Sequence, residues 1–104
     1  MILDVLEQAI REKRCLTALH NGTRRRFAPH AIGFTSNSVP AAFVFQYAGE
    51  TTSALPLKGE WRCLHIEDLS HVAENGDRWR TPSNYSLLRQ TCLEQVALAV
   101  PEEV

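Results

Sequence analysis

The first apolar pattern in this chain has the period of an α-helix. Between residues 2 and 14, Leu3, Leu6 and Ile10 recur at spacings of three and four, and polar side chains occupy most of the intervening positions. Asp4 lies early in this run and the basic residues lie late, an order that the helix dipole favours. The pattern predicts a helix over residues 2–14 whose apolar stripe packs against the rest of the domain.

After this helix the pattern changes to that of strands. Asn21-Gly22 lies between two β-capable runs, 15–20 and 23–28, and this dipeptide is the strongest short-range signal of a hairpin with a type I′ turn. Pro29 cannot donate a hydrogen bond to a neighbouring strand, so it predicts the end of the second run.

Three further strands are predicted downstream. Residues 41–47 place aromatic side chains at every second position, which indicates a deeply buried strand. Residues 61–66 alternate as well, with Trp61 on one face and Arg62 on the other, and a short strand over 69–73 follows them. The three runs continue an antiparallel arrangement because no helix separates them.

The remaining segments predict a loop and a second helix. Residues 48–59 are rich in glycine, threonine, serine and proline, so we expect a long loop with a short edge strand at 54–55. Thr81-Pro82 has the form of a helix N-cap with proline at the first helical position. A helix is therefore expected from about 82 to 100, where Pro101 would stop it.

This order of elements places the chain in the mainly β, α+β class. A chain of 104 residues is long enough for one modest core, so residues 1–104 are expected to form a single domain. The strands, over about residues 15–75, predict a small antiparallel barrel or a strongly bent sheet between an N-terminal and a C-terminal helix.

Charge and cysteine content narrow the classes of function. The formal net charge is −1, so any binding to an anionic partner must come from a local patch. No apolar run approaches the roughly 20 residues of a membrane-spanning helix, and the N-terminus does not have the pattern of a signal peptide. Three widely spaced cysteines, Cys15, Cys63 and Cys92, indicate reduced thiols, and the protein is expected to be cytoplasmic and not bound to a membrane.

The arginine run of the hairpin is the main functional signal. On one strand Arg24 and Arg26 share a face while Arg25 points the other way. With Arg62 nearby, two or three guanidinium groups could bind phosphate bidentately. The alternative is an edge strand whose charges only prevent aggregation.

Two tryptophans are candidates for stacking on bases. Trp61 begins a strand beside a loop, and Trp79 lies in a charged turn between Arg78 and Arg80. Trp79 and its two flanking arginines form a second small basic and aromatic site.

Metal binding and catalysis find little support. His20, His30, His65 and His71 do not have the paired spacing of a metal site, and no cofactor motif is present. Cys63 and His65 share a strand face without a third orienting group, so a buried structural thiol explains Cys63 better than a nucleophile does. We expect no enzyme activity.

The chain resembles a WYL domain, a small ligand-binding module of many bacterial transcription regulators. The resemblance is carried by residues 9–16, by 21–29 with its arginines followed by proline, and by 61–72, and it covers residues 9–74. It implies an Sm-like barrel of the SH3 type capped by an N-terminal helix. It also implies a module that senses an effector or binds nucleic acid rather than an enzyme.

The chain departs from the family pattern at several polar positions. Phe43-Val44-Phe45 replaces the Trp-Tyr-Leu motif that names the family, and Leu19 stands at a usual tyrosine. Arg62 matches the first arginine of the late motif, but Asp68 occupies the second arginine position, where a carboxylate would repel phosphate.

Two hypotheses follow from the sequence. The first is a WYL-like regulatory module that binds a nucleotide or single-stranded nucleic acid through Arg24, Arg26 and Arg62, with Trp61 beside them. The second is a protein–protein interaction or assembly module without a small-ligand site, whose partner is a second copy of the chain or a regulatory protein.

Overall fold

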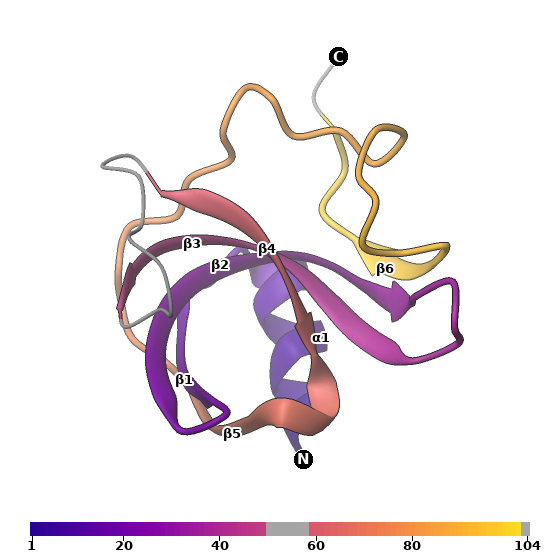
Figure 1. Cartoon of the computed structure of the whole chain (residues 1–104). Helices are drawn as coiled ribbons and strands as arrows, with labels where there is room; N and C mark the ends of the chain where they lie inside the picture. The colour runs from indigo at the N-terminus through magenta and orange to yellow at the C-terminus, as the bar shows by residue number, and fades with distance from the viewer. Residues whose placement is uncertain (50–58, 103–104) are drawn as a thin grey trace.

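The computed structural model describes residues 1–49 and 59–102 and is sheet-rich (Figure 1). The predicted edge strand at 54–55 lies outside the described residues. The elements are α1 Ile2–Glu12, β1 Leu16–His20, β2 Thr23–Phe34, β3 Pro40–Gly49, β4 Glu60–His65, the 3₁₀ turn η1 Ile66–Asp68, β5 Leu69–Glu74 and β6 Gln95–Ala99.

The N-terminal helix forms as the sequence predicts. Leu6, Ala9 and Ile10 are buried in the core, and α1 packs against β2, β5 and β6. The helix ends at Lys13, whose left-handed backbone lets its N–H return to the carbonyl of Ala9. None of the described helices is both long and apolar enough to cross a membrane.

The predicted hairpin is confirmed. β1 pairs with β2 from Leu16 opposite Phe27 to His20 opposite Thr23. Asn21 and Gly22 both adopt positive φ, at 50° and 82°, as a type I′ turn requires.

The sequence predicts that the second strand ends at Pro29, but β2 does not end there. The strand continues to Phe34, with a break in register against β3 between Pro29 and Ala31. On its other side β2 pairs with β1 only as far as Phe27 and with β6 only from Ala31. The missing N–H of proline thus falls at the gap between two partner strands, where no ladder hydrogen bond is needed.

The strands form one antiparallel sheet in the order β4-β3-β2-β1-β5, with β6 added to the second half of β2. The predicted closed barrel is wrong: β4 and β5 are joined through η1, but they do not pair among the described residues. Figure 1 shows a strongly curled sheet around α1, which is the bent-sheet form of the same antiparallel class.

The predicted C-terminal helix over 82–100 is also wrong. Residues 75–94 contain only turns and irregular backbone, and β6 follows them. A helix over these residues would place Leu88 in an apolar stripe with Tyr85 and Cys92, but Leu88 is 92% exposed. β6 can approach β2 closely because Gly33 lacks a side chain where the carbonyl of Gln95 lies.

The expectation of three reduced thiols needs correction. Cys63 on β4 forms a disulfide with Cys92, with Cα atoms 5.4 Å apart, and only Cys15 is a free, buried thiol. Cys63 is therefore not the buried thiol that the sequence favoured, and its sulfur is not available as a nucleophile while the disulfide is intact.

Candidate functional site

The irregular segment after β5 is fixed to the sheet by a hydrogen-bond network. The Asn75 side-chain amide donates to the Thr17 hydroxyl and to the Tyr47 hydroxyl, each at 3.1 Å, and its oxygen accepts from the Asp77 N–H at 2.8 Å. Tyr47 in turn donates to the Asp77 carboxylate at 2.6 Å. Burial raises the pKa of Tyr47, and the bond to Asp77 raises it further, so this hydroxyl remains a donor.

Trp79 is fixed by the fully buried His30. The two rings stack with centroids 4.6 Å apart, and the Trp79 indole N–H donates to the Thr81 hydroxyl at 3.1 Å. His30 Nδ1 lies 2.8 Å from the Ala28 carbonyl and Nε2 lies 3.0 Å from Thr81 Oγ1. A proton on Nδ1 satisfies every partner, because Nε2 can then accept from the Thr81 hydroxyl.

The protonation state of His30 agrees with this arrangement. Burial lowers the pKa of His30 to about 4, against the opposing effect of the hydrogen bond to Ala28. The ring is therefore neutral at pH 7, and it supports Trp79 without adding a charge.

These anchors shape a concavity of about 570 Å³ beside β2 and β3. We call it the arginine groove, and its lining residues are Arg26, Tyr47, Ala48, Asp77, Arg78, Trp79 and Arg80.

The groove contains three arginines and one carboxylate. Arg26 lies 3.6 Å from Asp77, and the Arg80 guanidinium lies 5.6 Å from the centre of the Tyr47 ring. Arg78 and Arg80 are exposed, so their charges face solvent. The groove is a positively charged surface with aromatic walls, and such a surface can bind phosphate groups and planar rings together.

The structure does not bring Arg24, Arg26 and Arg62 into one site. Arg24 is exposed on β2 and does not line the groove. Arg62 lies 2.7 Å from Glu60 on its own strand, and its Nε has no hydrogen-bond partner among the described residues.

Of the hairpin arginines, Arg25 has a pKa that the charge of Arg62 affects. Strand alternation predicts that Arg25 lies on the opposite face from the arginines on either side of it. Arg25 is buried and donates to the side-chain oxygen of Gln46 at 3.0 Å. Burial lowers the pKa of Arg25, and the positive charge of Arg62 lowers it further.

Asp68, the acidic departure from the family motif, lies away from the arginine groove. Its carboxylate is 4.0 Å from His20, and it does not line the groove. Burial lowers the pKa of His20 and the charge of Arg25 lowers it further, while Asp68 raises it.

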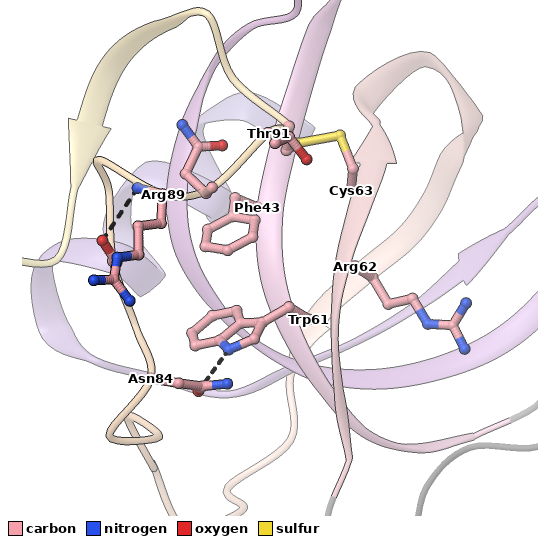
Figure 2. Close-up of a pocket in the computed structure, with 10 residues that line it drawn as sticks. Phe43, Trp61, Arg62, Cys63, Asn84, Arg89 and Thr91 are labelled. Carbon is pink, nitrogen blue, oxygen red and sulfur yellow. Dashed lines mark hydrogen bonds between the residues drawn. A yellow bond between two sulfur atoms is a disulfide. The ribbon is translucent and has the colours of Figure 1, made fainter.

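Trp61 lines a different concavity, of about 460 Å³, between β4 and the segment before β6. We call it the tryptophan pocket (Figure 2), and its lining residues are Phe43, Trp61, Arg62, Cys63, Asn84, Ser86, Arg89, Gln90, Thr91 and Cys92.

The aromatic wall of this pocket is rigidly packed. Phe43 and Trp61 stack with centroids 4.7 Å apart and planes 10° from parallel, and Tyr85 packs 5.5 Å from Trp61. The Trp61 indole donates to the Asn84 side-chain oxygen at 2.9 Å. Figure 2 shows the Arg62 side chain leaving β4 in the direction opposite to Trp61, so its guanidinium does not enter the pocket.

Sequence reasoning found Arg26 and the Arg78-Trp79-Arg80 segment separately but could not join them. It did not find Arg89, because no motif marks that residue, and it expected Cys92 to be a reduced thiol rather than a disulfide partner of Cys63. The chain matches no family model, and no curated protein or solved structure is significantly similar to it.

Proposed function

We propose that this protein is a WYL-like regulatory module that binds a nucleotide or single-stranded nucleic acid in the arginine groove. The observation that carries this proposal is that Arg26 of the hairpin meets Arg78 and Arg80 around one concavity with aromatic walls. The proposal involves no reaction and no cofactor.

The charge of the groove supports an anionic ligand. The Asp77 carboxylate pairs with Arg26 and accepts from Tyr47, so it is already engaged. Arg78 and Arg80 remain as exposed cations, and guanidinium groups bind phosphate oxygens in a bidentate manner. Since Asp68 lies elsewhere, the departure from the family motif places no repulsive charge in this groove.

The aromatic side chains support a ligand with bases. Trp79 is held by stacking on His30, and Tyr47 is held by its hydroxyl, so neither ring must be ordered when a ligand binds. Stacking of a base on an aromatic side chain contributes about 1–3 kcal/mol and tolerates any base.

The test is fluorescence anisotropy with a labelled single-stranded oligonucleotide over a salt series. Three phosphate contacts predict a slope of log Kobs against log salt of about −2, from about −0.7 per contact. The variant Arg78→Gln/Arg80→Gln is expected to reduce this slope to about −0.7 and to weaken binding at low salt.

A matched control removes the same charge elsewhere. Arg11→Gln/Arg14→Gln eliminates two exposed arginines, one in the last turn of α1 and one just after it, that do not line the groove, and is expected to leave binding unchanged. Equal losses in both double variants would show only non-specific attraction to positive charge. An absence of binding at low salt would set nucleic acid aside.

An assembly function is the second candidate, and it has one observation of its own. In the described part of the chain β6 pairs only with β2, which leaves its outer edge unpaired. Val96 on β6 is 43% exposed, and Phe34, at the end of β2 opposite Gln95, is 41% exposed. A second copy could extend the sheet there, and Val96→Lys would then convert a dimer to a monomer in analytical ultracentrifugation.

The compartment remains a prediction. The cytoplasmic expectation depended partly on reduced thiols, and the Cys63–Cys92 disulfide removes that support. Stable disulfides are typical of oxidising compartments, so labelling of free thiols in freshly lysed cells would decide the matter.

A further inference from the structure

The tryptophan pocket lies apart from the arginine groove. The two concavities share none of the lining residues that the structure describes. The pocket is in the size range of small-molecule sites, and it combines an aromatic wall with a few polar groups. It therefore requires an explanation of its own.

Several polar groups of the pocket are already occupied by the fold. The Gln90 side chain donates to the Leu93 carbonyl and accepts from the Leu93 N–H, each at 2.7 Å. Ser86 Oγ accepts from the Arg89 N–H at 3.1 Å. These bonds shape the turn rather than offer a ligand contact.

Two nitrogen donors among the remaining polar groups are available to a ligand. Asn84 uses its oxygen to accept from Trp61, which leaves its amino group as a donor. Arg89 is exposed, and no ion pair of its guanidinium is found among the described residues. Figure 2 shows the Arg89 side chain on the side of the pocket that faces Trp61 and Asn84.

The charge of the pocket is set by Arg89. The lining includes no carboxylate in the described residues, and the Arg62 side chain is directed away and paired with Glu60. Glu102 borders a neighbouring depression with Arg89, where its carboxylate accepts from the Leu87 N–H. A ligand with one negative charge matches the single guanidinium of the pocket.

We propose that the tryptophan pocket binds a small planar organic acid, an aromatic carboxylate of one or two rings. Its ring packs against Phe43 and Trp61, its carboxylate pairs with Arg89, and the Asn84 amino group donates to it. A carboxylate suits this site because the planar guanidinium fork matches its two oxygens.

The disulfide preorganises this site. Cys63 and Cys92 both line the pocket and join its two walls, β4 and the segment before β6. That segment is irregular, so the covalent link holds Arg89 at a fixed place relative to Trp61. A ligand then meets a formed site rather than ordering a loose segment.

The test is isothermal titration calorimetry of the oxidised protein with phenylacetate and 2-naphthoate, against their uncharged amides. Each acid is expected to bind at least tenfold more tightly than its amide. The exposed Arg89→Gln variant should abolish that difference, whereas Arg11→Gln, on α1, should retain it. In two-dimensional NMR spectra the Trp61 indole N–H should shift with the acid.

Equal binding of acid and amide, or an unchanged preference in Arg89→Gln, would overturn the proposal, as would an unmoved Trp61 signal. The Arg78→Gln/Arg80→Gln variant separates this site from the arginine groove. It should bind the acids normally, so the two proposals fail or succeed independently.

Discussion

Buried His30 makes the stability of this protein depend on pH in a range where most carboxylates are still ionised. The ring is fully buried, stacks on Trp79 and is neutral with a proton on Nδ1. The pKa of His30 is lowered to about 4, whereas the unfolded chain has the ordinary value of about 6.5. Between these values the unfolded state binds more protons than the folded state does.

The sign and size of the effect follow from that difference. The contribution of His30 to the free energy of unfolding is complete above about pH 6.5 and is lost as the pH falls towards 4. The full loss would be about 3.4 kcal/mol, from a difference of about 2.5 in pKa at 1.36 kcal/mol each. Between pH 7.5 and pH 5 the loss attributable to this one ring is about 2 kcal/mol.

The assay is urea denaturation of the wild type and of His30→Gln at pH 7.5 and pH 5. The variant will be less stable at both values because the buried network is changed, but other groups titrate equally in the two proteins. We therefore expect the wild type to lose about 2 kcal/mol more than the variant over this interval. Equal losses, or an NMR titration of His30 with a pKa near 6.5, would show that the folded state does not hold this ring neutral.

Three further predictions concern the fold. Reducing the Cys63–Cys92 disulfide, whose cysteines are 29 residues apart, should lower the free energy of unfolding by about 3.5 kcal/mol in chemical denaturation, and an unchanged midpoint would contradict this. Gly33→Ala would drive a methyl group into the Gln95 carbonyl, so we expect a lower melting temperature and faster amide exchange in β6, and an unchanged melting temperature would contradict this. Tyr47→Phe removes a charge-assisted hydrogen bond of 2.6 Å and should cost about 1.5–3 kcal/mol in the same denaturation assay; a loss below 0.5 kcal/mol would be too small for this bond.

The parts of the fold that were predictable from the sequence are those set by local physics. The apolar stripe of α1 and the Asn21-Gly22 turn act over a few residues, and the structure confirms both. The alternation in β4 also holds, with Trp61 against the aromatic cluster and Leu64 buried on the opposite face.

The C-terminal segment was misread because its structure is decided by distant partners. Residues 82–94 contain many good helix formers, yet the covalent link to β4 and the pairing of β6 with β2 determine their path. Whether three cysteines yield a disulfide depends on which side chains the fold brings together, and a spacing of 29 residues does not reveal that.

The candidate site was predictable in its pieces and not in its assembly. Arg26 and Arg80 are far apart in the sequence. They line the same groove because the bond between Asn75 and Tyr47 anchors the segment after β5, which carries Arg80, to the sheet. Alternation places Arg25 on the opposite face from its neighbours, but its burial and its bond to Gln46 depend on the pairing of β2 with β3, which the sequence does not reveal.

The most direct test of the arginine groove is an NMR titration of the labelled protein with a single-stranded tetranucleotide. We expect the Trp79 indole N–H and the backbone amides of residues 26, 47 and 77–80 to shift together and saturate. Shifts confined to the Trp61 indole and residues 84–92, or no shifts at low salt, would contradict it.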